Sequence, residues 1–313
     1  MANKPYTIIT DSAANLTPGL INRYQLPIVS LSYIFEGEEH LSYRPGVESN
    51  LKSVYENMRQ KAPIKTSCMN EDHCREVFEA PLKLGHDILY IGFSSGLSAS
   101  YAVGETVANE LKKAYPGQKI YTVDSFAAAM GQGRLVTIAC EMKEKGAEID
   151  EVLTWVTDNR LKMCHLFTVD TLFHLYRGGR VTRSKHLLAD TLNIKPILHV
   201  NDEGRLVAIG KTFGRKASLA NLASRMAKEI VNPEEQTIYI SHGDCIEDVE
   251  YLIKRISDKL TVKEYVINIL DLVVGAHSGP GTVAVFYLAH SRHGEDAAAA
   301  PAAKSLKKSE QPR

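Results

Sequence analysis

Apolar runs bounded by turn residues alternate along the chain with stretches of helical period. This is the pattern of repeated β–α units, which build a mostly parallel sheet covered by helices. The first series of units predicts one open α/β lobe, with strands at residues 6–10, 27–35, 87–93 and 119–123 and helices at residues 47–60, 71–84, 98–114, 127–145 and 149–162.

A second series of units predicts a second α/β lobe. Two apolar runs joined by a short turn at Gly204 are typical of a hairpin, so we expect this second sheet to be mixed. The expected strands are residues 164–169, 194–200, 206–211, 237–241, 262–269 and 283–288, and the expected helices are residues 184–192, 216–230 and 246–260. We therefore predict an α/β fold of two lobes, residues 1–163 and 164–290.

Residues 291–313 contain no aromatic side chain and are rich in Ala, Lys, Ser, Glu and Pro. Such a composition buries too little apolar surface to offset the entropy of ordering the chain. We predict a disordered tail for this segment.

Charge is balanced in the chain of 313 residues, with 37 basic and 37 acidic side chains. A chain without net charge lacks the field that attracts proteins to nucleic acid or to anionic membranes, so neither is an expected partner. No apolar run approaches the roughly 20 residues that cross a bilayer, and the first residues do not form a signal-peptide core. The sequence predicts a cytoplasmic protein.

The five cysteines are scattered and form no C-x-x-C pair, so we interpret them as reduced thiols. Cys68, His73 and Cys74 lie close in sequence, but structural zinc takes four ligands and no second pair of ligands is evident. The chain has neither a P-loop nor a dinucleotide-binding glycine motif after a strand. We therefore expect no metal and no cofactor.

Three predicted strands end in an aspartate followed by a hydroxyl residue, at Asp11, Asp124 and Asp170. The carboxyl ends of strands face the ligand crevice in open α/β sheets, so these side chains are expected to converge on one rim. Asp, Ser and Thr are also the preferred N-cap residues of helices, and capping alone would explain them. Both interpretations stay open at this point.

A fourth strand end, residues 91–98, joins a buried strand to a helix through small and hydroxyl residues that include Ser94 and Ser95. Backbone N–H groups at a helix start, together with hydroxyls, suit an anionic head group such as a carboxylate or a phosphate. A simple N-cap with glycines that ease the turn is the structural alternative.

The same turn matches G-x-S-x-G, the nucleophile motif of α/β hydrolases, between a strand and a helix. Ser94, Asp244 and His277 would follow the chain order of a hydrolase triad. No His-Gly-Gly segment that could form an oxyanion hole precedes Ser94, which argues against this hypothesis.

Near the end of the chain, residues 275–282 place three glycines and a proline around His277. We expect a loop of fixed shape, from which a histidine can donate a hydrogen bond to an anion near neutral pH.

Arg180 follows two glycines, which would let its guanidinium approach a carboxylate or phosphate; a solvated helix end is the alternative. Thr66 is predicted in a loop between two helices.

Taken in order, these segments resemble the DegV family from residue 6 to about residue 288. The resemblance implies two α/β lobes that hold one long-chain fatty acid between them, and a binding role in place of an enzymatic one. The motifs that carry it are Thr10-Asp11-Ser12, Lys65-Thr66-Ser67, Ser94-Ser95-Gly96-Leu97-Ser98, Val123-Asp124-Ser125, Gly178-Gly179-Arg180 and His277-Ser278-Gly279-Pro280-Gly281-Thr282.

The resemblance also assigns roles to single residues. It implies that the fatty acid carboxylate binds Thr66, Ser95 and His277, and we include Ser94 in the same site. It implies further that a separate fatty acid kinase phosphorylates the bound carboxylate, with Arg180 and Ser278 near the head group or the partner surface. Relatives usually continue Thr-Ser with Gln-Pro where this chain has Cys-Met, so the head-group loop is expected to differ in shape.

The first hypothesis is therefore a carrier that binds a fatty acid and presents its carboxylate to a kinase. Burial of an acyl chain is favourable by roughly 0.8 kcal/mol per CH₂, whereas a buried carboxylate must be paired or hydrogen-bonded. A serine hydrolase that cleaves acyl esters through Ser94 is the second hypothesis, and a sensor of small anions is the third.

Overall fold

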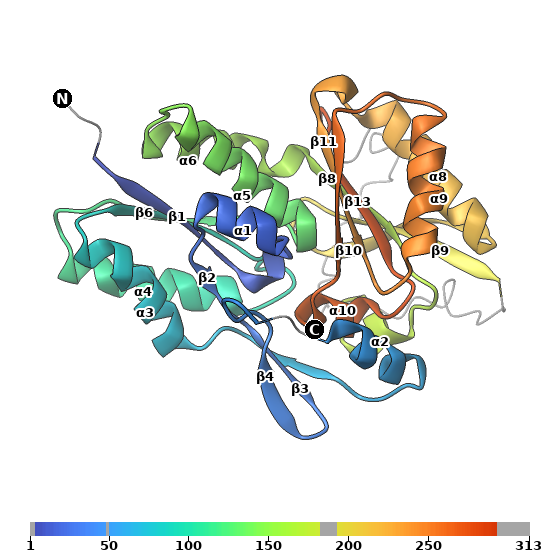
Figure 1. Ribbon diagram of the computed structural model, residues 1–313, viewed down its shortest axis with the longest axis horizontal. Helices are drawn as coiled ribbons and strands as arrows, with labels where there is room; N and C mark the ends of the chain where they lie inside the picture. The colour runs from blue at the N-terminus through green and yellow to red at the C-terminus, as the bar shows by residue number, and fades with distance from the viewer. Residues whose placement is uncertain (1–3, 48–49, 182–192, 293–313) are drawn as a thin grey trace, which may run out of the picture.

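The computed structural model describes residues 4–47, 50–181 and 193–292 and shows two α/β lobes side by side (Figure 1). The first lobe is built on a four-stranded sheet in which all neighbouring strands are parallel. In spatial order its strands are β2 (Ile28–Val29), β1 (Tyr6–Asp11), β6 (Asp87–Gly92) and β7 (Ile120–Asp124). This confirms the predicted open, parallel sheet.

Helices cover both faces of this sheet. Successive side chains of a strand point to opposite faces of the sheet, so neighbouring residues of β6 contact different helices. Tyr90 packs with α3 and α4, whereas Leu89 and Ile91 pack with α1, α5 and α6. The helices are α1 (Pro18–Tyr24), α3 (Glu71–Lys83), α4 (Ser100–Ala114), α5 (Ala129–Glu144) and α6 (Ile149–Asn159).

A small antiparallel sheet extends from the first lobe, with the order β4 (Glu38–Leu41), β3 (Ser32–Phe35) and β5 (Lys65–Ser67); α2 (Leu51–Arg59) follows β4 in the chain. The sequence predicted one strand over residues 27–35, but the chain leaves the parallel sheet at Ser30, whose hydroxyl accepts a bond from the Tyr43 N–H at 2.9 Å. Thr66 was expected in a loop and instead lies in β5, opposite Tyr33. A strand of three residues is too short to show an apolar alternation.

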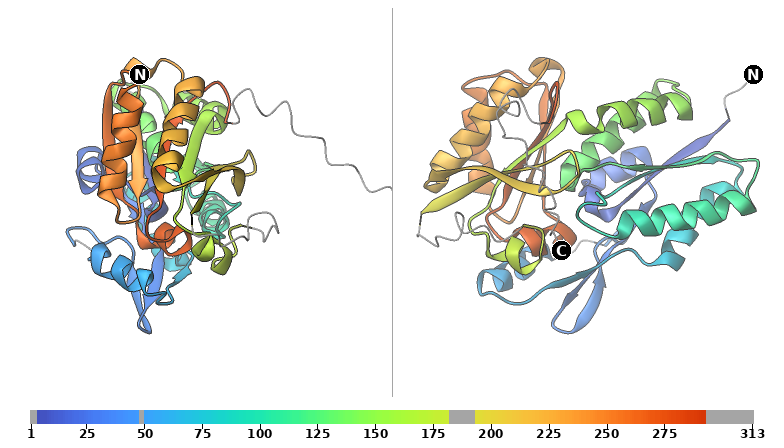
Figure 2. Two further views of the ribbon diagram at one scale, coloured as in Figure 1. Left: turned by 90° about the vertical axis from the view of Figure 1, so that its right-hand side faces the viewer. Right: turned by 180° about the vertical axis from the view of Figure 1, so that it is seen from behind.

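The second lobe is built on a six-stranded mixed sheet, as predicted. Helices α8 (Arg215–Glu229) and α9 (Ile246–Ser257) pack on its outer face, away from the first lobe (Figure 2). Two short helices, α7 (Phe173–Arg177) and α10 (Leu272–Ser278), pack against each other. The strand order is β10 (Leu206–Phe213), β9 (Ile194–Val200), β8 (Met163–Thr168), β13 (Val283–Leu288), β11 (Thr237–His242) and β12 (Glu264–Ile269).

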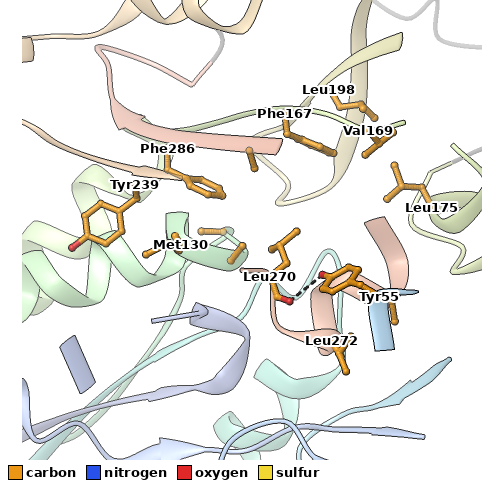
Figure 3. Close-up of a cluster of buried hydrophobic side chains, with 14 of the residues drawn as sticks. Tyr55, Met130, Phe167, Val169, Leu175, Leu198, Tyr239, Leu270, Leu272 and Phe286 are labelled. Atoms are coloured by element: carbon orange, nitrogen blue, oxygen red, sulfur yellow. Dashed lines mark hydrogen bonds between the residues drawn. The ribbon is translucent and has the colours of Figure 1, made fainter. Parts of the chain in front are cut away.

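The inner face of the second sheet packs against α5 of the first lobe. Eleven of the sixteen residues of α5 are buried, so this helix lacks the polar face of a surface helix. Its Met130 lies in one apolar cluster with Tyr239 and Phe286 of the second sheet (Figure 3). Strands of the first lobe precede Met163 and those of the six-stranded sheet begin there, which supports our proposal of a lobe boundary at residue 163.

Two of the predictions fall partly or wholly on residues that the structure does not describe. The helix expected at residues 184–192 lies outside the described residues, as do residues 293–313 of the expected tail. Ser291 and Arg292, which the composition assigned to that tail, belong to the folded structure instead. Among the described residues, no helix combines the length and the apolar character needed to cross a bilayer.

Arg292 is buried and its guanidinium joins segments from both lobes. Its Nε donates to the Met163 carbonyl at 3.1 Å and its Nη2 to the Arg160 carbonyl at 2.7 Å. Its Nη1 donates at 2.8 Å both to the Phe126 carbonyl, in the first lobe, and to the Asn201 carbonyl, in the second. Burial lowers the pKa of Arg292 to about 10, so the side chain stays charged at neutral pH.

We expect Arg292→Ala to lower the free energy of unfolding by about 3–5 kcal/mol, because four carbonyl oxygens lose their donor. Urea unfolding should show a lower midpoint with an unchanged slope. Arg23→Ala is the matched control, since the Arg23 side chain is 61% exposed and its ion pair with Glu144 is on the surface. Equal midpoints for the two variants would mean that the bonds of Arg292 between the lobes do not stabilise the fold.

Candidate functional site

A cavity of about 240 Å³ lies between the two lobes, and both lobes contribute to its wall. Most of the wall is apolar, and Phe167, Leu175, Leu270 and Phe286 point toward one another across this region in Figure 3. The polar or titratable side chains of the wall are Thr66, Ser67, Cys68, Ser98, His165, Arg180, His277, Ser278 and Thr282. An apolar cavity with a few polar groups is the usual form of a small-molecule site.

Thr66 and His277 form the centre of the polar part of the wall. Thr66 lies on β5 of the first lobe and His277 on α10 of the second, and the Thr66 Oγ1 is 2.8 Å from the His277 Nε2. The other ring nitrogen, Nδ1, is buried and has no hydrogen-bond partner among the described residues. The structure thus brings together two of the residues that the sequence predicted for carboxylate binding.

His277 does not lie on a loop, as the sequence analysis expected. Helix α10 continues to Ser278, and the glycine-rich turn begins only at Gly279, which has φ 86°. The first of the two glycines that precede Arg180 lies against His277: a Cβ at Gly178 would lie 2.1 Å from the His277 Nδ1. The absence of a side chain at position 178 therefore gives space to the imidazole.

The electrostatics of this end of the cavity favour an anion. Burial, followed by the charges of Arg180 and Arg177, lowers the pKa of His277 to about 4. Burial and Arg177 lower the pKa of the neighbouring His174 to about 4 as well. Both imidazoles are therefore neutral near pH 7, and a bound carboxylate would offset the positive field of the two arginines.

The polar end also reaches the surface of the molecule. Cys68 and Ala99, which line the cavity, are exposed. Ser98 lines the wall beside Ala99, and its hydroxyl lies 3.0 Å from that of Ser100. Ser98 belongs to one of the motifs that carry the resemblance but is not among the predicted ligands. Its place at the end of the turn, next to the helix start, is a signal in the sequence that could have identified it.

Arg180 lines the cavity and ties the two lobes together. Its Nε and Nη2 both donate to the Leu97 carbonyl at 3.1 Å, and its Nη1 donates to the Gly178 carbonyl. Burial lowers the pKa of Arg180 from its ordinary value. Ser278 also lines the cavity, and its hydroxyl lies 3.4 Å from the Val274 carbonyl, so both residues predicted near the head group border the cavity.

The structure does not bring Ser94 and Ser95 into the cavity wall. Ser94 is fully buried, and its hydroxyl donates to the Gly204 carbonyl at 2.8 Å. Ser95 is exposed, and its N–H points to the carboxylate of Asp124, a neighbour that would repel an anionic head group.

The triad required by the hydrolase hypothesis is not assembled. The Ser94 hydroxyl is bound to a backbone carbonyl and His277 to Thr66. The third member, Asp244, forms an ion pair with Arg59 at 2.8 Å. Since no base among the described residues contacts the Ser94 hydroxyl, these residues do not form an activated nucleophile.

The three strand-end aspartates have structural partners. Asp11 accepts bonds from the Tyr90 hydroxyl at 2.7 Å and the Phe93 N–H at 2.8 Å. Asp124 accepts from the Phe126 N–H at 2.9 Å, and Asp170 pairs with Lys195 at 3.0 Å. These contacts are structural, and Asp11 also caps the short helix Ser12–Ala14, as the capping alternative predicts. None of the three aspartates lines the cavity.

The cysteine pair considered for a metal is divided between core and surface. Cys74 is buried, which raises the pKa of its thiol to about 12, and Cys68 is exposed. All five cysteines are free thiols, and no group of three metal-binding side chains gathers within the part of the chain that the structure describes.

Known proteins are similar to this chain over most of its length. A family model described as an uncharacterised protein of the DegV family matches residues 5–290. A DegV domain-containing protein of Clostridium perfringens is 41% identical over 291 residues, which cover 92% of this chain and 99% of the relative. A similar protein of Lactococcus lactis is 29% identical over 281 residues, or 90% and 96% of the two chains.

Solved structures share the same architecture. A DegV family protein from Thermus thermophilus, described by its fatty acid binding, superposes with a TM-score of 0.81 at 26% identity, over 91% of this chain and 99% of its own. A DegV lipid-binding protein from Thermotoga maritima superposes with a TM-score of 0.78 at 23% identity, over 92% and 99%. A stearic-acid-binding protein from Eubacterium ventriosum superposes with a TM-score of 0.80 at 21% identity, over 91% and 98%.

The lowered pKa of His277 predicts that acid destabilises the protein. Between pH 6.5 and pH 4 the unfolded chain binds a proton that the folded protein does not, so unfolding becomes more favourable as the pH falls. One such group contributes up to about 1.4 kcal/mol per pH unit. Urea titrations at pH 7 and pH 5 should therefore show a smaller loss of stability for His277→Asn than for the natural sequence, by about 1–2 kcal/mol. Identical losses would mean that His277 titrates normally.

Proposed function

Because the chain belongs to the DegV family, we propose that it binds one long-chain fatty acid in the cavity between its lobes, as a bacterial, cytoplasmic carrier. The observation that carries this proposal is a cavity wall that is mostly apolar and has a polar end at Thr66 and His277. The apolar part would bury the acyl chain. The polar end, at Thr66 and His277, would receive the carboxylate.

The chemistry of the polar end supports a carboxylate over an uncharged head group. A buried carboxylate is tolerated when several donors bind it. The Thr66 hydroxyl, the neutral His277 imidazole and the Ser98 hydroxyl can donate, and Arg180 supplies charge close by. We choose Ser98 over Ser94 and Ser95 because Ser98 lies in the cavity wall.

We propose further that the carrier presents its carboxylate to a separate fatty acid kinase, which forms the acyl phosphate. The exposure of Cys68 and Ala99 beside the polar end supports this step, since an enzyme must reach the carboxylate without removing the chain. Arg177, exposed on α7, and the partly buried Arg180 are the partner-facing cations of this proposal.

Solvent extraction of purified protein, followed by mass spectrometry, should release about one fatty acid per chain. Delipidated protein should gain thermal stability from added oleate or palmitate, because a ligand that binds the folded state alone shifts the unfolding equilibrium. Thr66→Val and Ser98→Ala should each weaken binding by about tenfold or more, which corresponds to the loss of one bond to a buried charge.

Ser95→Ala is the matched control for Ser98→Ala, since it removes the same hydroxyl from the same turn outside the cavity. Its affinity should stay within about twofold of the natural sequence, as expected for an exposed side chain. A delipidated protein that neither acid stabilises would overturn the carrier proposal. A larger loss in Ser95→Ala than in Ser98→Ala would move the carboxylate to the other side of the turn.

The kinase step predicts that Arg177→Ala lowers the rate of acyl phosphate formation by about fivefold or more, through loss of a rim charge at the partner surface. The rate can be followed by trapping the acyl phosphate with hydroxylamine, with ATP and a bacterial fatty acid kinase present. Fatty acid affinity should fall by less than the rate does, because Arg177 acts on the carboxylate only through its field and does not line the cavity. Arg23→Ala, an exposed arginine on α1, is the control. Equal rates of acyl phosphate formation for both variants would mean that Arg177 does not contact the kinase.

A further inference from the structure

One wall of the cavity is built from strained backbone. Ala128 and Ala129 line the cavity at the start of α5, and the segment 126–129 is called here the alanine wall. Phe126 has φ 47° and Ala129 has φ 50°, both in the left-handed region. Each residue with a Cβ costs roughly 1–3 kcal/mol there, so the wall keeps this shape only while its surroundings hold it.

Three bonds from the first lobe hold the beginning of the alanine wall. The Asp124 carboxylate accepts from the Phe126 N–H at 2.9 Å, and the Ser125 hydroxyl accepts from the Ala127 N–H at 3.1 Å. The Ser94 N–H donates to the Ala127 carbonyl at 3.0 Å. These bonds fix the segment up to Ala127 and leave the two cavity-lining alanines to other contacts.

The second lobe supplies the contact at Ala128. The His165 Nε2 accepts from the Ala128 N–H at 3.3 Å, while its Nδ1 lies 2.9 Å from the Met163 carbonyl. A carbonyl only accepts and an amide N–H only donates, so the ring must carry its proton on Nδ1 and present a lone pair at Nε2. Burial, with the charge of Arg292, lowers the pKa of His165 well below its ordinary value, which agrees with this neutral form.

His165 is itself part of the cavity wall. Its ring meets that of Phe286 edge-on, with centroids 5.3 Å apart and an interplanar angle of 88°. The first turn of α5 rests directly on the ring, because a Cβ at Gly131 would lie 2.2 Å from the Nε2. A shift of the imidazole must therefore move either the alanine wall or the start of α5.

We propose that His165 is a positioning residue that fixes the alanine wall and thereby sets which shapes of acyl chain the cavity accepts. This inference rests on the proposed binding of a fatty acid. The polar end of the cavity is formed by other residues, so His165 acts on the chain and not on the carboxylate. When the wall is released, the cavity widens at the alanines and accepts a bent cis-unsaturated chain more readily than before.

The test compares binding of stearate and oleate to delipidated protein in competition. His165→Leu removes the acceptor for the Ala128 N–H, and the ratio of oleate to stearate affinity should rise at least threefold. His165→Gln keeps an acceptor oxygen at the place of Nε2, and its ratio should stay within twofold of the natural sequence. Hydrogen exchange at the Ala128 amide should accelerate in the leucine variant and stay slow in the glutamine variant.

A second route to the same change avoids the loss of the buried imidazole. Gly131→Ala places a methyl group against the His165 ring and should shift the affinity ratio in the same direction. Gly117→Ala is its matched control, since a Cβ at position 117 has no neighbour within 4 Å. Unchanged ratios in folded His165→Leu and Gly131→Ala, with tight binding of both acids, would overturn the inference alone. A natural sequence that binds neither acid would overturn the proposed function as well.

Discussion

Helix α5 is buried between the two sheets, and the rest of the molecule is arranged around that constraint. A helix enclosed on both sides can be approached closely only where its side chains are small. Gly131 gives space to the His165 ring of the second lobe, and a Cβ at Gly133 would lie 2.6 Å from the Ala14 carbonyl of the first. Both lobes therefore approach this helix closely at its glycines, and the start of the helix forms one wall of the cavity.

The serine-rich turn after β6 has two functions that are separated by only a few residues. Its beginning binds the second lobe, because the Ser94 hydroxyl donates to Gly204, and a Cβ at Gly96 would lie 2.5 Å from the Glu203 carbonyl. Its end, at Ser98, lines the cavity. The hairpin turn between β9 and β10 is also held by Arg292, through Asn201. Closure of the cavity and the placement of Ser98 thus depend on the same interface.

The polar end of the cavity lowers the stability of the fold in acid. Two histidines are held neutral with a pKa of about 4, beside two arginines whose charges act on His277. On unfolding, both imidazoles return to their ordinary pKa, so the folded protein loses stability as the pH falls. A surface histidine, whose pKa is the same in the folded and unfolded states, would not have this effect. An anion of the kind we propose at Thr66 and His277 would offset this field and so stabilise the folded protein.

The sequence determined the two α/β lobes, the parallel and mixed sheets, and the resemblance that selected Thr66, His277, Arg180 and Ser278, all of which line the cavity. Hydrophobic periodicity and turn residues are local features of the chain, so the elements that they predict can be identified from the sequence alone. The pairing of Thr66 with His277 joins residues 211 positions apart and only the tertiary structure decided it. Only the tertiary structure shows that Ser98 lines the cavity and Ser95 does not, because one turn presents neighbouring hydroxyls in different directions. The same is true of Arg292, whose four carbonyl partners come together only in the folded chain.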